Sequence, residues 1–107
     1  MSVGMIITNS PDDADSFYVP VLTESVFNRT VLPVAEQIGA ELVCRFGLGL
    51  DVEASDADAL ERELRLVLEH LDPATGLKDG IEARFHNLIA EFQHIFATRP
   101  DAIVFIG

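Results

Sequence analysis

Two histidines, His86 and His94, lie in the segment ARFHNLIAEFQHIFA, residues 83–97. Imidazole is a frequent zinc ligand and titrates near neutral pH. On a helix these positions, i and i+8, face a similar direction but lie about 12 Å apart along the axis, which one ion cannot bridge. Glu82 and His86 form an i, i+4 pair, but a third ligand would have to come from His70 or a carboxylate elsewhere. We therefore expect no metal site and no cofactor.

The most acidic stretch is DVEASDADALERE, residues 51–63, which resembles a calcium-binding loop only at its start. Position six of such a loop should be glycine and is Asp56, and position twelve should be glutamate and is Arg62. Two interpretations remain: a solvated acidic turn that complements a helix dipole, or a surface that attracts a basic partner. The candidate partner-binding residues are Asp51, Glu53, Asp56, Asp58, Glu61 and Glu63.

Motifs for nucleophilic catalysis are absent from the sequence. No serine lies in a nucleophile-elbow pattern, and neither HExxH nor CxxC occurs. The single cysteine, Cys44, is predicted to point into the core, where a thiol is inert. The loop at 9–16 has no glycine-rich cradle for a phosphate group. We expect no catalytic residues.

Composition restricts the partners and the compartment. Asp and Glu number 18 and Lys and Arg 7, which gives a formal charge of −11. Such a chain should repel nucleic acid and anionic membranes. One cysteine allows no intramolecular disulfide, and neither a leader segment nor a membrane span is visible, so a cytoplasmic location is expected. The hydrophobic fraction of 49% is high for a small domain and predicts a homodimer.

The elements that must position these residues follow from hydrophobic periodicity. We predict strands at 3–8, 41–52 and 102–106, and a short edge strand at 17–22 that Pro20 disfavours. A helix is expected from Thr23 to Gly39, kinked by Pro33 or restarted with Thr30 as its N-cap. Two more helices should begin with capping boxes, Ser55 with Asp58 and Asp79 with Glu82. Their predicted core positions are Leu60, Leu64, Val67, Leu68 and Leu71 in the first, and Ile81, Phe85, Leu88, Ile89, Phe92, Ile95 and Phe96 in the second.

The chain, residues 1–107, is thus predicted to be one small globular domain of the two-layer α/β class, in the order β-α-β-α-α-β. Its sheet should have three strands, or four if the edge strand forms, with the helices mainly on one face. Ile6, Val43, Val104 and Ile106 would then lie on the other face, where a second copy could cover them. A strip of the last helix lies opposite its core positions and is a candidate contact face, because its alanine side chains are small enough for another helix to approach. Its residues are Ala83, His86, Ala90, His94 and Ala97.

Two functions fit this reading. The first is a non-catalytic, acidic protein-interaction domain, an inhibitor or immunity-type protein that masks a basic protein partner. The alternative is a small-ligand-binding domain or an enzyme whose site forms at a homodimer interface, where side chains of two chains converge.

Overall fold

A computed structural model describes residues 2–8 and 19–107. The loop expected at 9–16 and the first two residues of the strand expected at 17–22 lie outside the described residues. The strands and helices are β1 (Ser2–Ile7), β2 (Val19–Thr23), α1 (Glu24–Val26), the π-helical η2 (Phe27–Val31), α2 (Leu32–Ile38), α3 (Glu41–Cys44), β3 (Leu50–Val52), the short 3-10 helix η3 (Ala54–Asp56), α4 (Ala57–His70), the 3-10 helix η4 (Pro73–Thr75), α5 (Lys78–Thr98) and β4 (Val104–Ile106).

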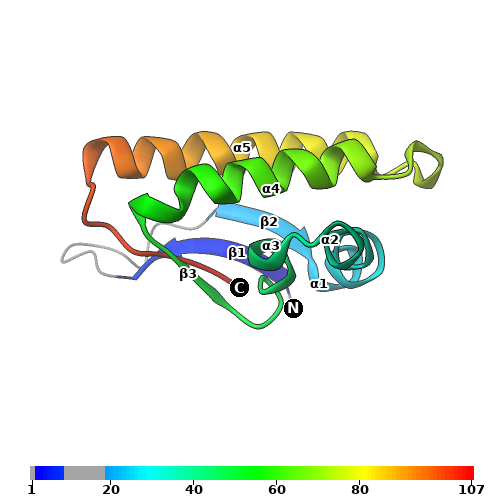
Figure 1. The fold of residues 1–107 in the computed structure, drawn as a ribbon, viewed down its shortest axis with the longest axis horizontal. Helices are drawn as coiled ribbons and strands as arrows, with labels where there is room; N and C mark the ends of the chain where they lie inside the picture. Colours follow the sequence, from blue (N-terminus) through cyan, green and yellow to red (C-terminus); the bar gives the residue numbers. More distant parts are fainter. Residues whose placement is uncertain (1, 9–18) are drawn as a thin grey trace.

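The sheet has four strands in the order β2-β1-β4-β3, and each neighbouring pair is antiparallel. Helices α4 and α5 lie side by side across one face, while α1, α2 and α3 gather near one end of the sheet (Figure 1). The two-layer class and the helices on one face are therefore confirmed, and the sheet contains the fourth strand that the sequence left open.

Proline is tolerated in β2 because β2 is an outer strand. Gly4 exchanges two main-chain hydrogen bonds with Gly107, at 3.1 and 3.0 Å, so its polar groups point toward β4. In an antiparallel ladder these directions alternate, so the neighbours of Gly4 point toward β2. Pro20 lies opposite Gly4, which places its ring nitrogen on the free edge of the sheet. No ladder hydrogen bond is lost there.

The segment between β2 and Gly39 winds continuously as α1, η2 and α2. Thr23 caps it by accepting from the Val26 N–H at 3.2 Å, so of the two alternatives the helix from Thr23 is present and no restart occurs at Thr30. The Leu32 N–H donates to the Phe27 carbonyl, a π-type bond just before Pro33. This wider turn accommodates a proline that could neither donate nor fit the ordinary ladder. Gly39 ends the helix in the left-handed region, at φ 76°, as expected.

The prediction of a long strand at 41–52 is wrong. Residues 41–44 form α3, a turn follows, and only Leu50–Val52 is strand. Val43 and Phe46, three residues apart, are fully buried, whereas Leu48, which would share the buried face of a strand with Phe46, is 92% exposed. The alternating pattern happened to coincide with a helical i, i+3 pair, and the first half of the segment packs against α2 and α4 instead of the sheet.

The two long helices have the predicted apolar faces but different starts. Every predicted core position of α4 and α5 is buried. The capping box before α4 pairs Glu53 with Asp56, not Ser55 with Asp58. The N-cap of α5 is Leu77, which makes Asp79 a first-turn residue instead of a cap. The pattern therefore located the start of each helix approximately, but it placed each cap two residues too far along the chain.

The prediction of which residues lie on the uncovered face of the sheet also needs correction. Ile6 faces away from α4 and α5 and is 37% exposed, but Val104 and Ile106 are fully buried and Val43 belongs to α3. The register explains this, because Ile6 pairs with Phe105, so the alternate residues of β4 face the helices. The uncovered face is lined by Ile6 and Phe105 instead.

Gly49 should not tolerate a side chain. Its φ of 100° is unfavourable for other residues, and an added Cβ would lie 2.8 Å from the Phe105 ring. We expect Gly49→Ala to lower the free energy of unfolding by more than about 1 kcal/mol. Gly80→Ala is the matched control: a Cβ there meets nothing within 4 Å, and the change should raise stability by about 0.4–1 kcal/mol. Urea denaturation of both variants measures the difference, and equal stabilities would contradict the role of Gly49.

Candidate functional site

The Glu63 carboxylate binds the start of α3. Its Oε1 accepts hydrogen bonds from the N–H groups of Leu42 and Val43, at 2.8 and 3.1 Å. The N-cap of α3, Ala40, has no side chain that could do this. A side chain on α4 therefore supplies the missing acceptor for a neighbouring helix. Although Glu63 is one of the predicted partner-binding residues, its carboxylate is directed into the molecule.

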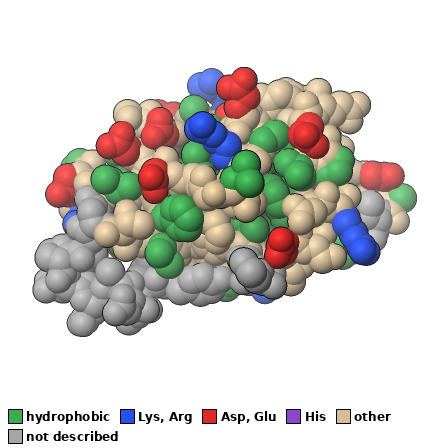
Figure 2. All heavy atoms as spheres, turned by 90° about the horizontal axis from the view of Figure 1, so that it is seen from below, with side chains coloured by type: hydrophobic (Ala, Val, Ile, Leu, Met, Phe, Trp, Pro, Cys, Tyr) green, Lys and Arg blue, Asp and Glu red, His purple; other side chains and the backbone are tan. Residues whose placement is uncertain are grey.

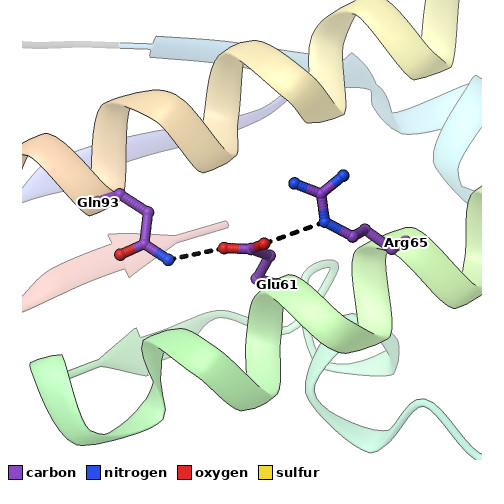
Figure 3. A network of polar contacts seen from close by, with 3 residues as sticks. All are labelled: Glu61, Arg65 and Gln93. Atoms are coloured by element: carbon purple, nitrogen blue, oxygen red, sulfur yellow. Dashed lines mark hydrogen bonds and ion pairs between the residues drawn. The ribbon is translucent and has the colours of Figure 1, made fainter.

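Glu61 joins α4 to α5 (Figure 3). Its two carboxylate oxygens accept from Arg65 Nε at 3.0 Å and from Gln93 Nε2 at 2.7 Å. The hydrogen bond from Arg65, then that from Gln93, hold the pKa of Glu61 below its ordinary value, against a smaller opposing effect of burial. The charged form of Glu61 is thus the form that the fold favours.

The other four acidic candidates divide into two pairs. Glu53 and Asp56 form the reciprocal capping box that begins η3, with the Glu53 N–H donating to Asp56 Oδ2 at 3.1 Å. Asp51 and Asp58 are exposed, and neither has a hydrogen-bond or ion-pair partner among the described residues. Of the predicted acidic patch, these two carboxylates are the ones fully available to another molecule.

The predicted helix contact face lies at the surface. Ala83, His86, Ala90, His94 and Ala97 are all exposed along α5. Within the described part of the chain, no three His, Cys, Asp or Glu side chains come together as a metal site would require. The strip is therefore accessible to another molecule, and its role as a contact face stays a prediction.

Cys44 is half-buried at the end of α3. Desolvation by burial raises the pKa of its thiol, and the carboxylates of Glu36, Glu63 and Glu41 raise it further. A thiol with a raised pKa is a poor nucleophile at neutral pH. Cys44 packs against the core but is only partly buried, and it stands in a helix and not in the predicted strand. The inertness of its thiol stays a prediction.

The sheet face away from α4 and α5 carries an apolar row next to a charge. Ile6, Phe105 and Asp51 lie side by side across β1, β4 and β3 by register. Leu48, in the turn before β3, is almost fully exposed. Viewed from this side, hydrophobic side chains occupy the middle of the surface and acidic ones lie mostly around them (Figure 2). Arg45 in the same turn is also exposed. None of the described helices covers this surface, which we call the open face.

A second feature, which the sequence did not reveal, is an apolar groove of about 310 Å³ between β2 and the start of α5. Its lining residues are Pro20, Val21, Leu22, Thr23, Val26, Leu77, Gly80, Ile81 and Arg84. The spacing of the last four, i, i+3, i+4 and i+7, was a visible signal of one helix face. That β2 would lie beside that face depended on the fold.

Comparisons of the chain with protein-family models, with curated proteins and with solved structures returned no match. In the described part of the chain, no helix is both long and apolar enough to cross a membrane.

We expect Glu63→Ala to lower the free energy of unfolding by about 1–2 kcal/mol, because two helix N–H groups lose their acceptor. Glu69→Ala is the matched control, since Glu69 lies exposed on the same helix. That change should stay within about 0.5 kcal/mol of the parent. Chemical denaturation measures both, and a loss for Glu63→Ala no larger than the control's would show that the cap is unimportant.

Glu61 should make stability depend on pH. A carboxyl with a lower pKa in the folded than in the unfolded state stabilises the protein above the unfolded pKa, and this contribution disappears as pH falls through the folded pKa. Since the pKa of Glu61 is lowered, Glu61→Gln should cost about 0.5 kcal/mol at pH 7, and the difference from the parent should vanish in acid.

Thermal unfolding of the parent and of Glu61→Gln, measured from pH 7 to pH 3, follows the difference in their stability. Glu69→Gln, an exposed glutamate on the same helix, should show little change at any pH. A Glu61→Gln deficit that stays constant across the range would rule out the charge of Glu61 as its cause.

Proposed function

We propose that this protein is a non-catalytic, acidic interaction domain of the inhibitor or immunity type, which binds and masks a basic protein partner in the cytoplasm. The observation that supports this most is the placement of its charge. The chain carries −11, and no polar or charged side chain is buried among the described residues. Much of the negative charge therefore lies at the solvent-facing surface, where it speeds encounter with a cationic surface.

Two of the predicted acidic residues, together with the open face, form the surface that we propose for the partner. Four of the predicted acidic residues hold the fold together, whereas the side chains of Asp51 and Asp58 have no partner in the part of the chain that the structure describes. Asp51 also continues the apolar row of the open face. A partner that combines lysine or arginine with apolar side chains could use both features, with the charge guiding approach and the apolar area slowing dissociation.

A homodimer, the other expectation from composition, would use the same open face. The two assemblies respond oppositely to salt. Two copies of a −11 chain repel one another, so screening should strengthen a dimer, whereas it should weaken a complex with a basic partner. Sedimentation velocity of the protein alone, at low and at high salt, measures the first effect directly.

The function is tested by capturing partners from the native cell at low salt and then measuring the association rate with the purified basic protein. We expect Asp51→Lys with Asp58→Lys to slow association by about tenfold or more at low salt. Glu36→Lys with Glu69→Lys, two exposed sites outside 51–58, changes the net charge equally and should slow it less.

Three results would count against the proposal. Capture that brings down no basic protein in stoichiometric amount contradicts the function. Equal slowing by the two double variants contradicts the assignment of the surface, and no slowing by either contradicts the electrostatic mechanism. Circular dichroism melting of each variant shows that the fold is retained.

A further inference from the structure

The groove beside β2 has two walls of different kinds. One wall consists of consecutive residues of β2, Pro20 to Thr23. β2 is an outer strand of the sheet, and its pairing with β1 shifts register at Val21, so these consecutive residues can border one groove beside the strand. The other wall is the helical stripe of Leu77, Gly80, Ile81 and Arg84 at the start of α5, and Val26 of α1 also lines the groove. The groove is thus the space beside the sheet edge that α5 shelters.

The edge of β2 is poorly suited to pairing with another strand. The ring nitrogen of Pro20 faces outward and has no hydrogen to donate, so an added strand would lose a ladder hydrogen bond at that point. An occupant of the groove should therefore be recognised by its apolar surface and by side-chain groups, and not by main-chain pairing.

The polar group that could orient such an occupant is the guanidinium of Arg84. Arg84 is exposed, and no described carboxylate lies within ion-pair distance of it, in contrast to Arg65, which is paired with Glu61. An unpaired guanidinium beside an apolar wall fits a carboxylate, which it can bind with two parallel hydrogen bonds.

The helix wall has free space at Gly80. A Cβ built on this residue would meet nothing within 4 Å. Glycine in a helix is unfavourable by about 1 kcal/mol relative to alanine, so its presence here leaves space at the cost of helix stability. A side chain larger than alanine at this position would project from the wall into the groove.

We propose that this groove binds a small carboxylic acid with an aliphatic or aromatic body. The apolar body lies between Val21, Val26 and Ile81, and the carboxylate pairs with Arg84. The volume, about 310 Å³, is at the lower end of the range for small-molecule sites, which restricts the ligand to a short chain or a single ring. This site goes beyond the proposed interaction with a basic protein, since it uses neither the acidic residues nor the open face.

The test titrates octanoate and, separately, octan-1-ol into the full ¹⁵N-labelled chain and follows amide chemical shifts. We expect saturable octanoate shifts confined to β2, α1 and the first turns of α5, with a dissociation constant of about 1 mM or tighter. Octan-1-ol should bind about tenfold more weakly because it cannot form the ion pair.

Two pairs of comparisons assign the site. Gly80→Phe should abolish the octanoate shifts by filling the groove, while Gly80→Ala should leave them unchanged. Arg84→Gln should bring octanoate to the affinity of octan-1-ol and leave octan-1-ol as it was. Arg84 is exposed, so this second variant tests the site even if the phenylalanine disturbs folding.

The proposal is overturned if octanoate causes no saturable shifts, if its shifts lie outside the groove, or if octan-1-ol binds equally well to the parent protein. Shifts of the groove amides that follow protein concentration without any ligand would show that a second copy occupies the groove, and they would overturn it too. Tight binding of an extended peptide that protects β2 amides from exchange would show instead that the edge pairs with a strand.

Discussion

The burial of the apolar sides of α4 and α5 against one face of the sheet is the constraint on which the rest of the structure depends. The predicted core positions of both helices are buried there, together with alternate residues of all four strands. This packing is the main source of stability available to a domain that contains no disulfide. It also has two consequences for the surface. The opposite face of the sheet is left without a described helix, and α5, lying over β2, shelters a groove along the sheet edge.

The carboxylates of this acidic chain have two different roles. Glu63 replaces a missing N-cap for α3, Glu61 connects α4 to α5, and Glu53 with Asp56 starts the turn before α4. Each of these groups has local donors that compensate its charge. The side chains of Asp51 and Asp58, which have no such donor among the described residues, add instead to the negative charge of the surface. Replacing an exposed carboxylate should therefore affect the stability of the fold less than replacing one that holds a helix.

The two surface features that the fold creates are chemically distinct. The open face combines an apolar row with Asp51 and suits a large, basic partner. The groove is narrow, apolar and bordered by Arg84, which suits a small anionic ligand. They lie on different parts of the sheet, since one involves its uncovered face and the other its β2 edge. A ligand in the groove would leave the open face accessible, so the two proposals can hold independently of each other.

The sequence by itself determined the elements whose periodicity is long and consistent. The stripes of α4 and α5, the apolar first strand and the stop at Gly39 follow from local pattern and backbone preference, and all are present. It failed at 41–52, where twelve residues fit a strand by alternation but Val43 and Phe46 fit a helix and its turn equally well. Only contacts with α2 and α4 decided between them. The roles of Glu61 and Glu63 were equally hidden, because their partners Gln93 and Leu42 are far away in the chain. The groove could not be predicted for the same reason. The sequence pattern indicates the strand and the helix face separately, but only tertiary packing brings β2 beside α5.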